Sequence, residues 1–375
     1  MKIGIDARSL LRYERAGLEH HVANLIFNLA KIDKENQYLL FFNFIRPEYK
    51  KFLPKFTSKN FNNIVCPIPS KIMTRLFKIH FPIEFCMGKL DVFHGPRHLL
   101  LHSIFAKSVL TIHDLMLVTH PEFLTLERVN AFKKNVDNGI KRADLIISVS
   151  EFTKNEIIKE WNIPKERIKV IYNGVGEEFY PIEDKTIIEK VKHKYGIKDK
   201  YILYVGNIEP KKNLLRLIEA FSLLKNSKDD YNLVIAGNKD WFFDKVFQKV
   251  NELNLQEDVI FTGYVPNEEL PALYSGAEIF VFPSLYEGFG MPVIEAMACG
   301  TPVITSNITS LPEVVKDAGI LIDPFNVEEI TKAMSQLLTD TNLQTKLREK
   351  GLLRAKLFSW GKTARETLAV YKELA

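Results

Sequence analysis

The chain has 375 residues, of which 46% are hydrophobic and 26% charged, so it is an ordinary globular protein with room for two domains. The net charge of +5 is too small to indicate a nucleic-acid-binding protein, although it suits anionic ligands or an anionic membrane surface. The three cysteines follow no disulfide or zinc pattern, and we expect reduced thiols in a cytosolic protein. We expect no signal peptide, because the chain begins directly with a predicted strand, MKIGID. We expect no membrane span, because no apolar run reaches the ~18 residues that a span needs.

Short apolar runs predict seven strands in the first half of the chain. They cover residues 2–6, 38–44, 63–67, 91–94, 108–113, 145–149 and 169–172. Stretches with helical periodicity separate most of them, most clearly at 17–30, 125–142 and 152–161. Strands that alternate with helices are typical of a mostly parallel sheet covered on both faces.

The same alternation begins again after a charged stretch. Six more strands are predicted at 201–205, 233–236, 259–262, 279–282, 302–305 and 319–322, and helices at 213–224, 241–253, 268–274, 292–298 and 327–339. We therefore expect an α/β protein with two Rossmann-like domains, 1–172 and 197–358, a linker at 173–196, and a terminal helix at about 359–375 that crosses back onto the first domain. Two such domains facing each other would form an interdomain cleft, where ligands are expected.

Residues 282–312 hold the pattern most typical of a binding site. A buried strand is followed by a glycine-rich turn at 287–290, and a helix begins directly after it. Backbone N–H groups at such a helix start attract anions, and glycines let a ligand approach closely. With Glu287 and Glu295 nearby, the pattern predicts a ligand that is phosphorylated and rich in hydroxyl groups, such as a nucleotide-sugar. The alternative is an ordinary strand–turn–helix with a solvated Glu295.

Two further groups lie at the carboxyl ends of predicted strands. Lys211 and Lys212 follow the first strand of the second half, where an ammonium could contact a phosphate, and we favour Lys212. His113 ends an apolar strand beside Asp114, which favours a ligand-facing histidine. The alternatives are solvated loop lysines and a structural histidine.

The sequence offers little for a metal or a dinucleotide. His94, His98 and His102 are four residues apart, but Gly95-Pro96 interrupts any helix between the first two, so we expect no metal site there. No Asp-x-Asp occurs either. The first strand lacks a following G-x-G-x-x-G, which argues against the alternative of a nucleotide-dependent oxidoreductase.

A basic amphipathic helix is predicted at 71–81. Lys71, Arg75 and Lys78 share helical spacing, with large apolar residues between them. Such a helix could lie on an anionic membrane, and the alternative is a solvated face above a core-facing one.

Together these features resemble the retaining GT-B glycosyltransferases of family 4, typified by bacterial mannosyl- and glucosyltransferases of lipopolysaccharide, O-antigen and capsule assembly. The resemblance covers nearly the whole chain and is strongest in YEGFGMPVIEAMACGTPVI, whose E-x7-E element is Glu287 and Glu295. It implies that Glu295 binds the donor ribose and Glu287 the donor sugar. It also implies that sugar and diphosphate are held by the turn residues Gly288, Phe289 and Gly290.

Other segments are similar to further landmarks of that family. YVGNIEPKKN looks like its diphosphate loop with Lys212 as the phosphate lysine, but Asn207 stands where an arginine is common. AGLEHHVANL resembles the loop near the donor phosphate, with Gly17 matching its second glycine and Ala16 replacing the first. TIHDL resembles the element that places His113 at the reacting sugar. VIYNGV and FSWGKTARETL also look like family segments.

The resemblance implies transfer of a hexose from an α-linked nucleotide-sugar with retention of configuration and without a metal or other cofactor. The sequences of these motifs look most like those of members that use GDP-mannose, and UDP-sugars are the alternative donors. A catalytically silent sugar-nucleotide-binding protein is the other alternative. The expected partners are the donor and a saccharide or polyprenyl-linked acceptor, with no nucleic acid. The expected location is the cytoplasm or the inner face of the cell membrane.

Overall fold

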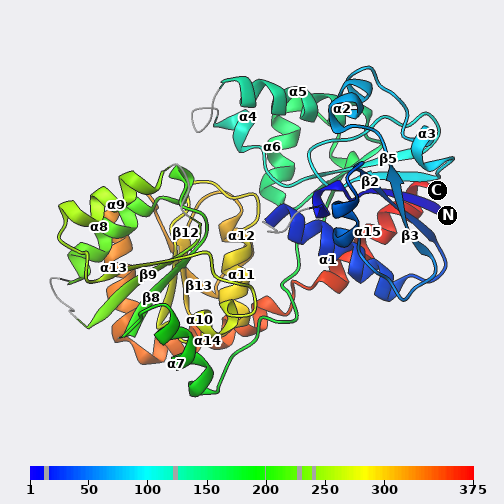
Figure 1. Cartoon of the computed structure of the whole chain (residues 1–375). Helices are drawn as coiled ribbons and strands as arrows, with labels where there is room; N and C mark the ends of the chain where they lie inside the picture. The colour runs from blue at the N-terminus through cyan, green and yellow to red at the C-terminus, as the bar shows by residue number, and fades with distance from the viewer. Residues whose placement is uncertain (12–16, 121–125, 199, 226–229, 239–241) are drawn as a thin grey trace. The chain divides into compact units, whose positions relative to one another are not determined.

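The computed structural model describes residues 1–11, 17–120, 126–198, 200–225, 230–238 and 242–375. The chain divides into two compact units (Figure 1). The first unit comprises Met1–Gly174 together with Trp360–Ala375, and the second comprises Val175–Ser359. Each unit is an α/β domain built on one parallel sheet, which confirms the predicted fold class.

The sheet of the first unit has seven parallel strands in the order β3-β2-β1-β4-β5-β6-β7. Each predicted strand is present within two residues of its expected ends. Their bounds are β1 Lys2–Asp6, β2 Gln37–Asn43, β3 Phe61–Cys66, β4 Val92–Gly95, β5 Lys107–Ile112, β6 Leu145–Ser148 and β7 Ile168–Val170.

Helices cover both faces of this sheet. Successive side chains of a strand point to opposite faces, so Leu40 and Phe42 pack on one side and Leu39 and Phe41 on the other. The helical segments are η1 Arg8–Leu10, α1 Gly17–Ile32, η2 Pro47–Phe52, α2 Ser70–Lys78, α3 Glu84–Met87, α4 Met116–Thr119, α5 Leu126–Arg142, α6 Glu151–Trp161, η4 Lys165–Arg167 and α15 Trp360–Leu374.

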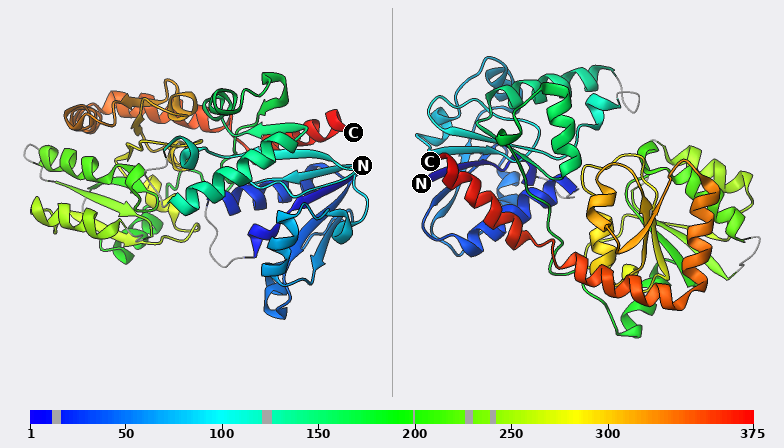
Figure 2. Two further views of the ribbon diagram at one scale, coloured as in Figure 1. Left: turned by 90° about the horizontal axis from the view of Figure 1, so that it is seen from above. Right: turned by 180° about the vertical axis from the view of Figure 1, so that it is seen from behind.

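The terminal helix α15 belongs to the first unit, where it lies against α1 (Figures 1 and 2). Its Val370 and Tyr371 are buried in the core that includes the α1 side chains. The Tyr371 hydroxyl lies 2.6 Å from Nδ1 of His94, and the Thr111 hydroxyl lies 2.8 Å from Nε2 of the same ring. Both nitrogens of this fully buried histidine therefore have partners, and burial lowers the pKa of His94 to about 3.

The second unit has six parallel strands in the order β10-β9-β8-β11-β12-β13. The strands are β8 Lys200–Val205, β9 Tyr231–Ala236, β10 Val259–Gly263, β11 Ile279–Phe282, β12 Val303–Ser306 and β13 Gly319–Ile322. The helical segments are α7 Lys185–Lys194, η5 Pro210–Lys212, α8 Leu214–Lys225, α9 Phe243–Glu252, α10 Leu270–Ser275, α11 Met291–Ala298, α12 Leu311–Val315, α13 Val327–Thr339 and α14 Thr341–Ala355.

Helix α7 lies where a linker at 173–196 was expected. Ile188 and Val191 are one helical turn apart and form a short apolar stripe. The stripe was not recognised in the sequence because charged residues surround it. Val191 is buried and Ile188 lies close to Gly276 after α10, while Asp184 caps the helix by accepting a hydrogen bond from the Thr186 amide. Most of the expected linker is therefore an ordered part of the second unit.

No helix within the described ranges is both long and apolar enough to cross a bilayer.

The contact between α15 and the sheet generates the first prediction. Tyr371→Phe removes the hydroxyl that pairs with His94 and leaves a buried ring nitrogen without a partner. We expect the free energy of unfolding of the first unit to fall by about 1–3 kcal/mol, measured by urea denaturation. Tyr180→Phe, at a tyrosine that is 56% exposed, is the control and should change nothing. Equal unfolding midpoints for Tyr371→Phe and the parent protein would contradict the prediction.

Candidate active site

The strand order of the second unit determines where a ligand can bind. The chain proceeds from β8 through β9 to β10 on one side, and from β11 through β12 to β13 on the other, so the order reverses between β8 and β11. In parallel sheets ligands bind beyond the carboxyl ends of the strands at such a reversal. The loops that leave these two strands are 206–213 and 283–290, which contain most of the predicted donor-binding residues.

Backbone hydrogen bonds hold these two loops together. The carbonyl of Lys211 accepts from the Leu285 amide at 2.7 Å and from the Ser284 hydroxyl at 3.1 Å. Asn213 has a left-handed backbone with φ 61°, which asparagine tolerates. Its side-chain amide donates to the carbonyls of Pro283 at 3.1 Å and Pro324 at 2.6 Å. The segments that follow β8, β11 and β13 are thus fixed to one another.

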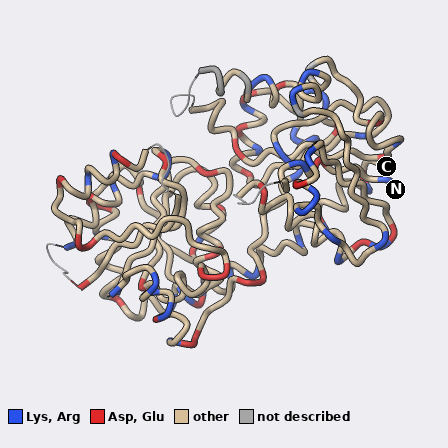
Figure 3. Tube along the Cα trace, in the orientation of Figure 1, with Lys and Arg blue, Asp and Glu red and all other residues tan. Residues whose placement is uncertain are grey.

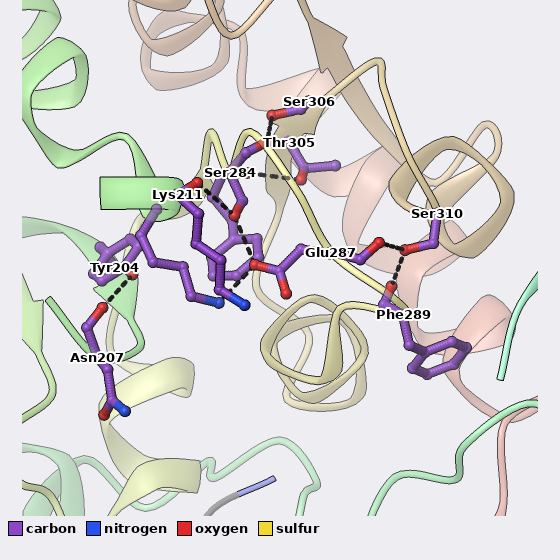
Figure 4. A network of polar contacts seen from close by, with 11 residues as sticks. Tyr204, Asn207, Lys211, Ser284, Glu287, Phe289, Thr305, Ser306 and Ser310 are labelled. Atoms are coloured by element: carbon purple, nitrogen blue, oxygen red, sulfur yellow. Dashed lines mark hydrogen bonds and ion pairs between the residues drawn. The ribbon is translucent and has the colours of Figure 1, made fainter. Parts of the chain in front are cut away.

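Lys212 and Glu287 form an ion pair across the joined loops. Nζ of Lys212 lies 2.6 Å from Oε1 of Glu287. The Ser284 hydroxyl donates to the same oxygen at 2.6 Å (Figure 4). The two charged side chains are only 12% and 11% exposed. The Lys212 ammonium also lies 4.9 Å from the centroid of the Phe282 ring. A cation and a carboxylate are therefore held side by side where the strand order reverses.

Glu287 stays ionised at neutral pH. Burial would raise the pKa of its carboxyl, but the charges of Lys212 and Lys211 and the hydrogen bonds from Lys212 and Ser284 lower it below its usual value. Both of these hydrogen bonds go to Oε1 and neither goes to Oε2. The carboxylate can therefore accept a hydrogen bond from a ligand hydroxyl, and it is a poor proton donor.

A serine side chain fixes the backbone of the predicted turn at 287–290. The Ser310 hydroxyl lies 2.9 Å from the carbonyl of Glu287 and 3.0 Å from that of Phe289 (Figure 4). The Phe289 ring packs against Phe358 at a centroid distance of 5.7 Å, so its side chain has a structural partner. Gly290 has φ 106°, a backbone conformation that strains any other residue, and a Cβ there would also displace the end of the Leu311 side chain, 2.7 Å away. The role of Gly288 and its neighbours in donor binding stays a prediction.

Glu295 has a different environment from Glu287. It lies on α11, where the Tyr274 hydroxyl donates to its Oε2 at 3.0 Å. Burial raises the pKa of Glu295 to about 7, with the charge of Glu178 adding to the effect and the Tyr274 hydrogen bond opposing it. The two predicted carboxylates therefore differ at neutral pH, because one is ionised and the other is near its midpoint.

Asn207 is exposed directly after Gly206 at the end of β8. Its carbonyl accepts a hydrogen bond of 3.3 Å from the buried Tyr204 hydroxyl (Figure 4). The backbone of the loop is thus fixed, while the amide side chain at this position carries no charge.

The first unit brings His113 into a cluster of aromatic rings. His113 follows β5, and its ring centroid lies 4.5 Å from that of His21 and 5.7 Å from that of His98. His21 is in turn 5.5 Å from the Trp360 ring, and its Nδ1 lies 2.8 Å from the amide oxygen of Asn173. Three segments singled out in the sequence, AGLEHHVANL, VIYNGV and FSWGKTARETL, therefore meet beside the predicted histidine.

His113 is neutral in this cluster. Its Nε2 lies 3.0 Å from the carbonyl of Pro96, which can only accept, so Nε2 carries the hydrogen. Burial, together with the neighbouring His21 and His98, holds the pKa of His113 well below its usual value. Burial also lowers the pKa of His21 to about 4. Nε2 of His21 is buried and has no hydrogen-bond partner among the described residues.

The remaining predicted positions carry less information. Gly17 is the exposed first residue of α1, and a Cβ there would meet open space, so packing does not require glycine. Ala16 lies outside the described residues. Within the described ranges no three His, Cys, Asp or Glu side chains are grouped to hold a metal ion.

Several residues of these sites were not predicted from the sequence. Ser284, Ser310 and Asn213 fix the loops of the second unit, and His21 and Asn173 surround His113. The only local signals were an asparagine at the start of a helix and a serine three residues before Glu287. The partners lie too far apart in the chain for spacing to reveal them.

Comparisons with known proteins identify the family of the chain. The pattern of Glycosyltransferase Family 4 matches residues 16–179, and that of Glycosyl transferases group 1 matches residues 187–354. The O-antigen chain mannosyltransferase B of Escherichia coli is 38% identical over 285 residues, which cover 76% of this chain and 74% of that protein.

Two solved structures share the fold over nearly their whole lengths. Sucrose-phosphate synthase from Thermosynechococcus elongatus superposes with a TM-score of 0.77 at 22% identity, covering 100% of this chain and 98% of the other. HepE from Anabaena in complex with UDP and glucose superposes with a TM-score of 0.73 at 17% identity, covering 99% of both chains.

The raised pKa of Glu295 generates a prediction about stability. Because the folded-state pKa of about 7 exceeds the unfolded value of about 4.3, the folded protein holds a proton that the unfolded chain releases between these pH values. This contribution is complete below about pH 4 and is lost as the pH rises through 7. Glu295→Gln mimics the protonated form, so it should raise the free energy of unfolding at pH 8 by up to about 3–4 kcal/mol and at pH 5 by only about 1 kcal/mol.

Thermal and urea unfolding from pH 5 to 8 would measure this difference. Glu349→Gln, at an exposed carboxylate on α14, is the control and should give a curve parallel to that of the parent protein. If Glu295→Gln also runs parallel to the parent, Glu295 is not held in an environment that favours its neutral form.

Proposed function

Because the chain belongs to the group 1 glycosyltransferases of family 4, we propose that it is a retaining hexosyltransferase with GDP-mannose as its donor. The proposed acceptor is a saccharide or a polyprenyl-linked saccharide in cell-surface polysaccharide assembly. The similarity to an O-antigen mannosyltransferase supports both mannose and this setting. A lipid-linked acceptor would bring the enzyme to the inner face of the cell membrane.

The observation that carries the proposal is the ion pair of Lys212 and Glu287 where the strand order reverses. A nucleotide-sugar presents a diphosphate and sugar hydroxyls next to each other, and these two groups need a cation and a hydrogen-bond acceptor. Lys212 supplies the cation, and the ionised Glu287 supplies the acceptor with its Oε2 oxygen.

The reaction replaces the nucleoside diphosphate at the anomeric carbon by an acceptor hydroxyl. Negative charge develops on the departing diphosphate, and a fixed cation stabilises it most in the transition state. In this proposal Lys212 contacts the diphosphate, Glu287 the transferred sugar and Glu295 the ribose, while the neutral His113 contacts the reacting sugar. Removing one such electrostatic partner typically slows a reaction about a hundred- to a thousandfold.

The alternative donor is a UDP-sugar, because HepE, which shares the fold, has been solved in complex with UDP-glucose. Thermal-shift screening against GDP-mannose, UDP-glucose, UDP-GlcNAc and the free nucleotides distinguishes the two. A shift with GDP and GDP-mannose alone supports the proposal, and a shift with UDP-sugars alone replaces it. A catalytically silent binding protein would shift with donor but release no nucleoside diphosphate when supplied with lipid-linked acceptors.

The assigned roles predict four different binding patterns. Lys212→Ala should weaken GDP and GDP-mannose about 10- to 100-fold and leave guanosine unaffected, because it removes a charge-assisted phosphate contact. Glu295→Ala should weaken all three ligands by a similar factor. Glu287→Ala and His113→Ala should slow transfer while leaving GDP affinity nearly intact. Isothermal titration with the three ligands, together with a transfer assay, measures these patterns.

Lys211→Ala is the matched control for Lys212→Ala, since it removes the neighbouring lysine, and it should have the smaller effect on diphosphate ligands. If Glu287→Ala and Glu295→Ala bind and turn over like the parent protein, residues 282–312 are structural and the proposed donor site is wrong.

We also predict that neither donor binding nor transfer depends on a divalent metal. The reason is that Lys212 can neutralise the diphosphate directly, while the sequence contains no Asp-x-Asp. The test is titration and turnover after treatment with EDTA, with a manganese-dependent transferase treated in parallel to verify chelation. Loss of donor binding that manganese or magnesium restores would overturn the prediction.

A further inference from the structure

Large apolar side chains are exposed on one part of the first unit, between β3 and β5. Ile79 and Phe85 are both 74% exposed, Phe105 is 67% exposed and Ile104 is 58% exposed. Burial of such side chains is the main source of stability in proteins, so their exposure close together is unusual in a soluble surface. They lie just after α2, on α3, and in the segment before β5.

A network around Glu84 holds these segments together. Oε1 of Glu84 accepts hydrogen bonds from the amides of Ile104 at 2.9 Å and Phe105 at 3.1 Å, and also from the Ser103 hydroxyl. The Ile83 amide donates to the carbonyl of His102 at 2.8 Å. These bonds fix residues 102–105 against α3, so the exposed side chains of both segments have defined positions.

Aromatic contacts extend the same surface toward α2. The Phe81 and Phe85 rings stack with centroids 4.7 Å apart, and the His80 and His102 rings lie 5.7 Å apart. These contacts bring residues 79–85 next to residues 102–105.

Helix α2 adds positive charge at the edge of this apolar surface. Met73 is buried in the core, and Phe77 packs against Phe41, so the opposite side of the helix faces outward. That side carries the exposed Lys71, Ile72 and Arg75, and basic residues gather at α2 in Figure 3. The predicted helix thus has both a core-facing stripe and an outer face that is basic and apolar.

Acidic side chains do not offset this charge. Between residues 67 and 90 the sequence contains four basic residues and one acidic residue, Glu84, whose carboxylate is used within the protein. Exposed apolar side chains beside uncompensated cations complement the surface of an anionic bilayer, where the apolar groups enter the acyl boundary and the cations meet the headgroup phosphates.

We propose that this part of the first unit docks on an anionic membrane. The docking surface consists of Lys71, Ile72, Arg75, Ile79, Phe85, Ile104 and Phe105. The inference rests on the proposed function in one respect: a transferase with a lipid-linked acceptor has a reason to bind a membrane. The contact itself requires neither donor nor turnover.

The test is co-sedimentation of the full chain with vesicles of phosphatidylcholine containing about 30% phosphatidylglycerol. We expect binding to these vesicles and at least about tenfold weaker binding to vesicles of phosphatidylcholine alone. Phe85→Ser with Phe105→Ser, and separately Lys71→Glu with Arg75→Glu, should each weaken binding about tenfold or more.

Matched controls change the same chemistry on the second unit. Leu353→Ser removes an apolar side chain that is 65% exposed, and Lys332→Glu with Lys346→Glu reverses two exposed lysines on α13 and α14. Both should bind vesicles like the parent protein. Equal weakening by these controls would show that net charge or general hydrophobicity, and not this surface, decides binding.

Glu84→Ala distinguishes the fixed apolar surface from simple charge attraction. It removes a negative charge, so attraction alone predicts tighter binding to anionic vesicles. We expect weaker binding, because residues 103–105 lose their hydrogen bonds to α3. Tighter binding would overturn the role assigned to the network.

Absence of vesicle binding by the parent protein would overturn the inference. So would a concentration-dependent dimer that Phe85→Ser with Phe105→Ser abolishes, since the surface would then contact a second copy of the chain. Transfer to a water-soluble acceptor, measured on the same preparations, separates this outcome from the proposed function. Turnover without vesicle binding contradicts the docking surface alone, and vesicle binding without turnover contradicts the transferase alone.

Discussion

The ion pair between Lys212 and Glu287 joins two loops of the second unit that are 75 residues apart in the chain. Neither charge could be buried to this degree alone, because an unpaired buried ion costs several kcal/mol. The pair is possible because the Lys211 carbonyl and the Asn213 amide already hold the loops together. The parallel sheet therefore places the loops, backbone bonds join them, and the charges then occupy fixed positions.

Glu287 and Glu295 show how environment separates the pKa values of two identical side chains. Glu287 has two cationic neighbours and remains an acceptor, whereas Glu295 is buried beside Tyr274, and no cation among the described residues lowers its pKa. Pairs of titratable groups whose environments separate their pKa values mark sites where distinct chemical tasks are performed. The eight-residue spacing of these glutamates in the sequence does not reveal this difference between their pKa values.

Much of the fold could be predicted from the sequence, because period-2 and period-3.6 patterns reflect burial on the faces of strands and helices. The same patterns placed Lys212, Glu287 and His113 at strand ends, where the structure has them. Helix α7 was missed because its short apolar stripe lies among charged residues. Ser310, Asn213 and Asn173 were missed because their roles depend on partners brought close only by the tertiary fold.

The position of α15 has a consequence for synthesis on the ribosome. Residues 1–174 emerge first, yet their core includes Ala364, Val370 and Tyr371. At translation rates of about 5–20 residues per second, the first unit waits on the order of ten seconds or more for the helix that completes it. The second unit is contiguous in the chain and can fold during that interval. The domain made first is thus the domain finished last, and α15 does not cover its apolar surface until synthesis ends.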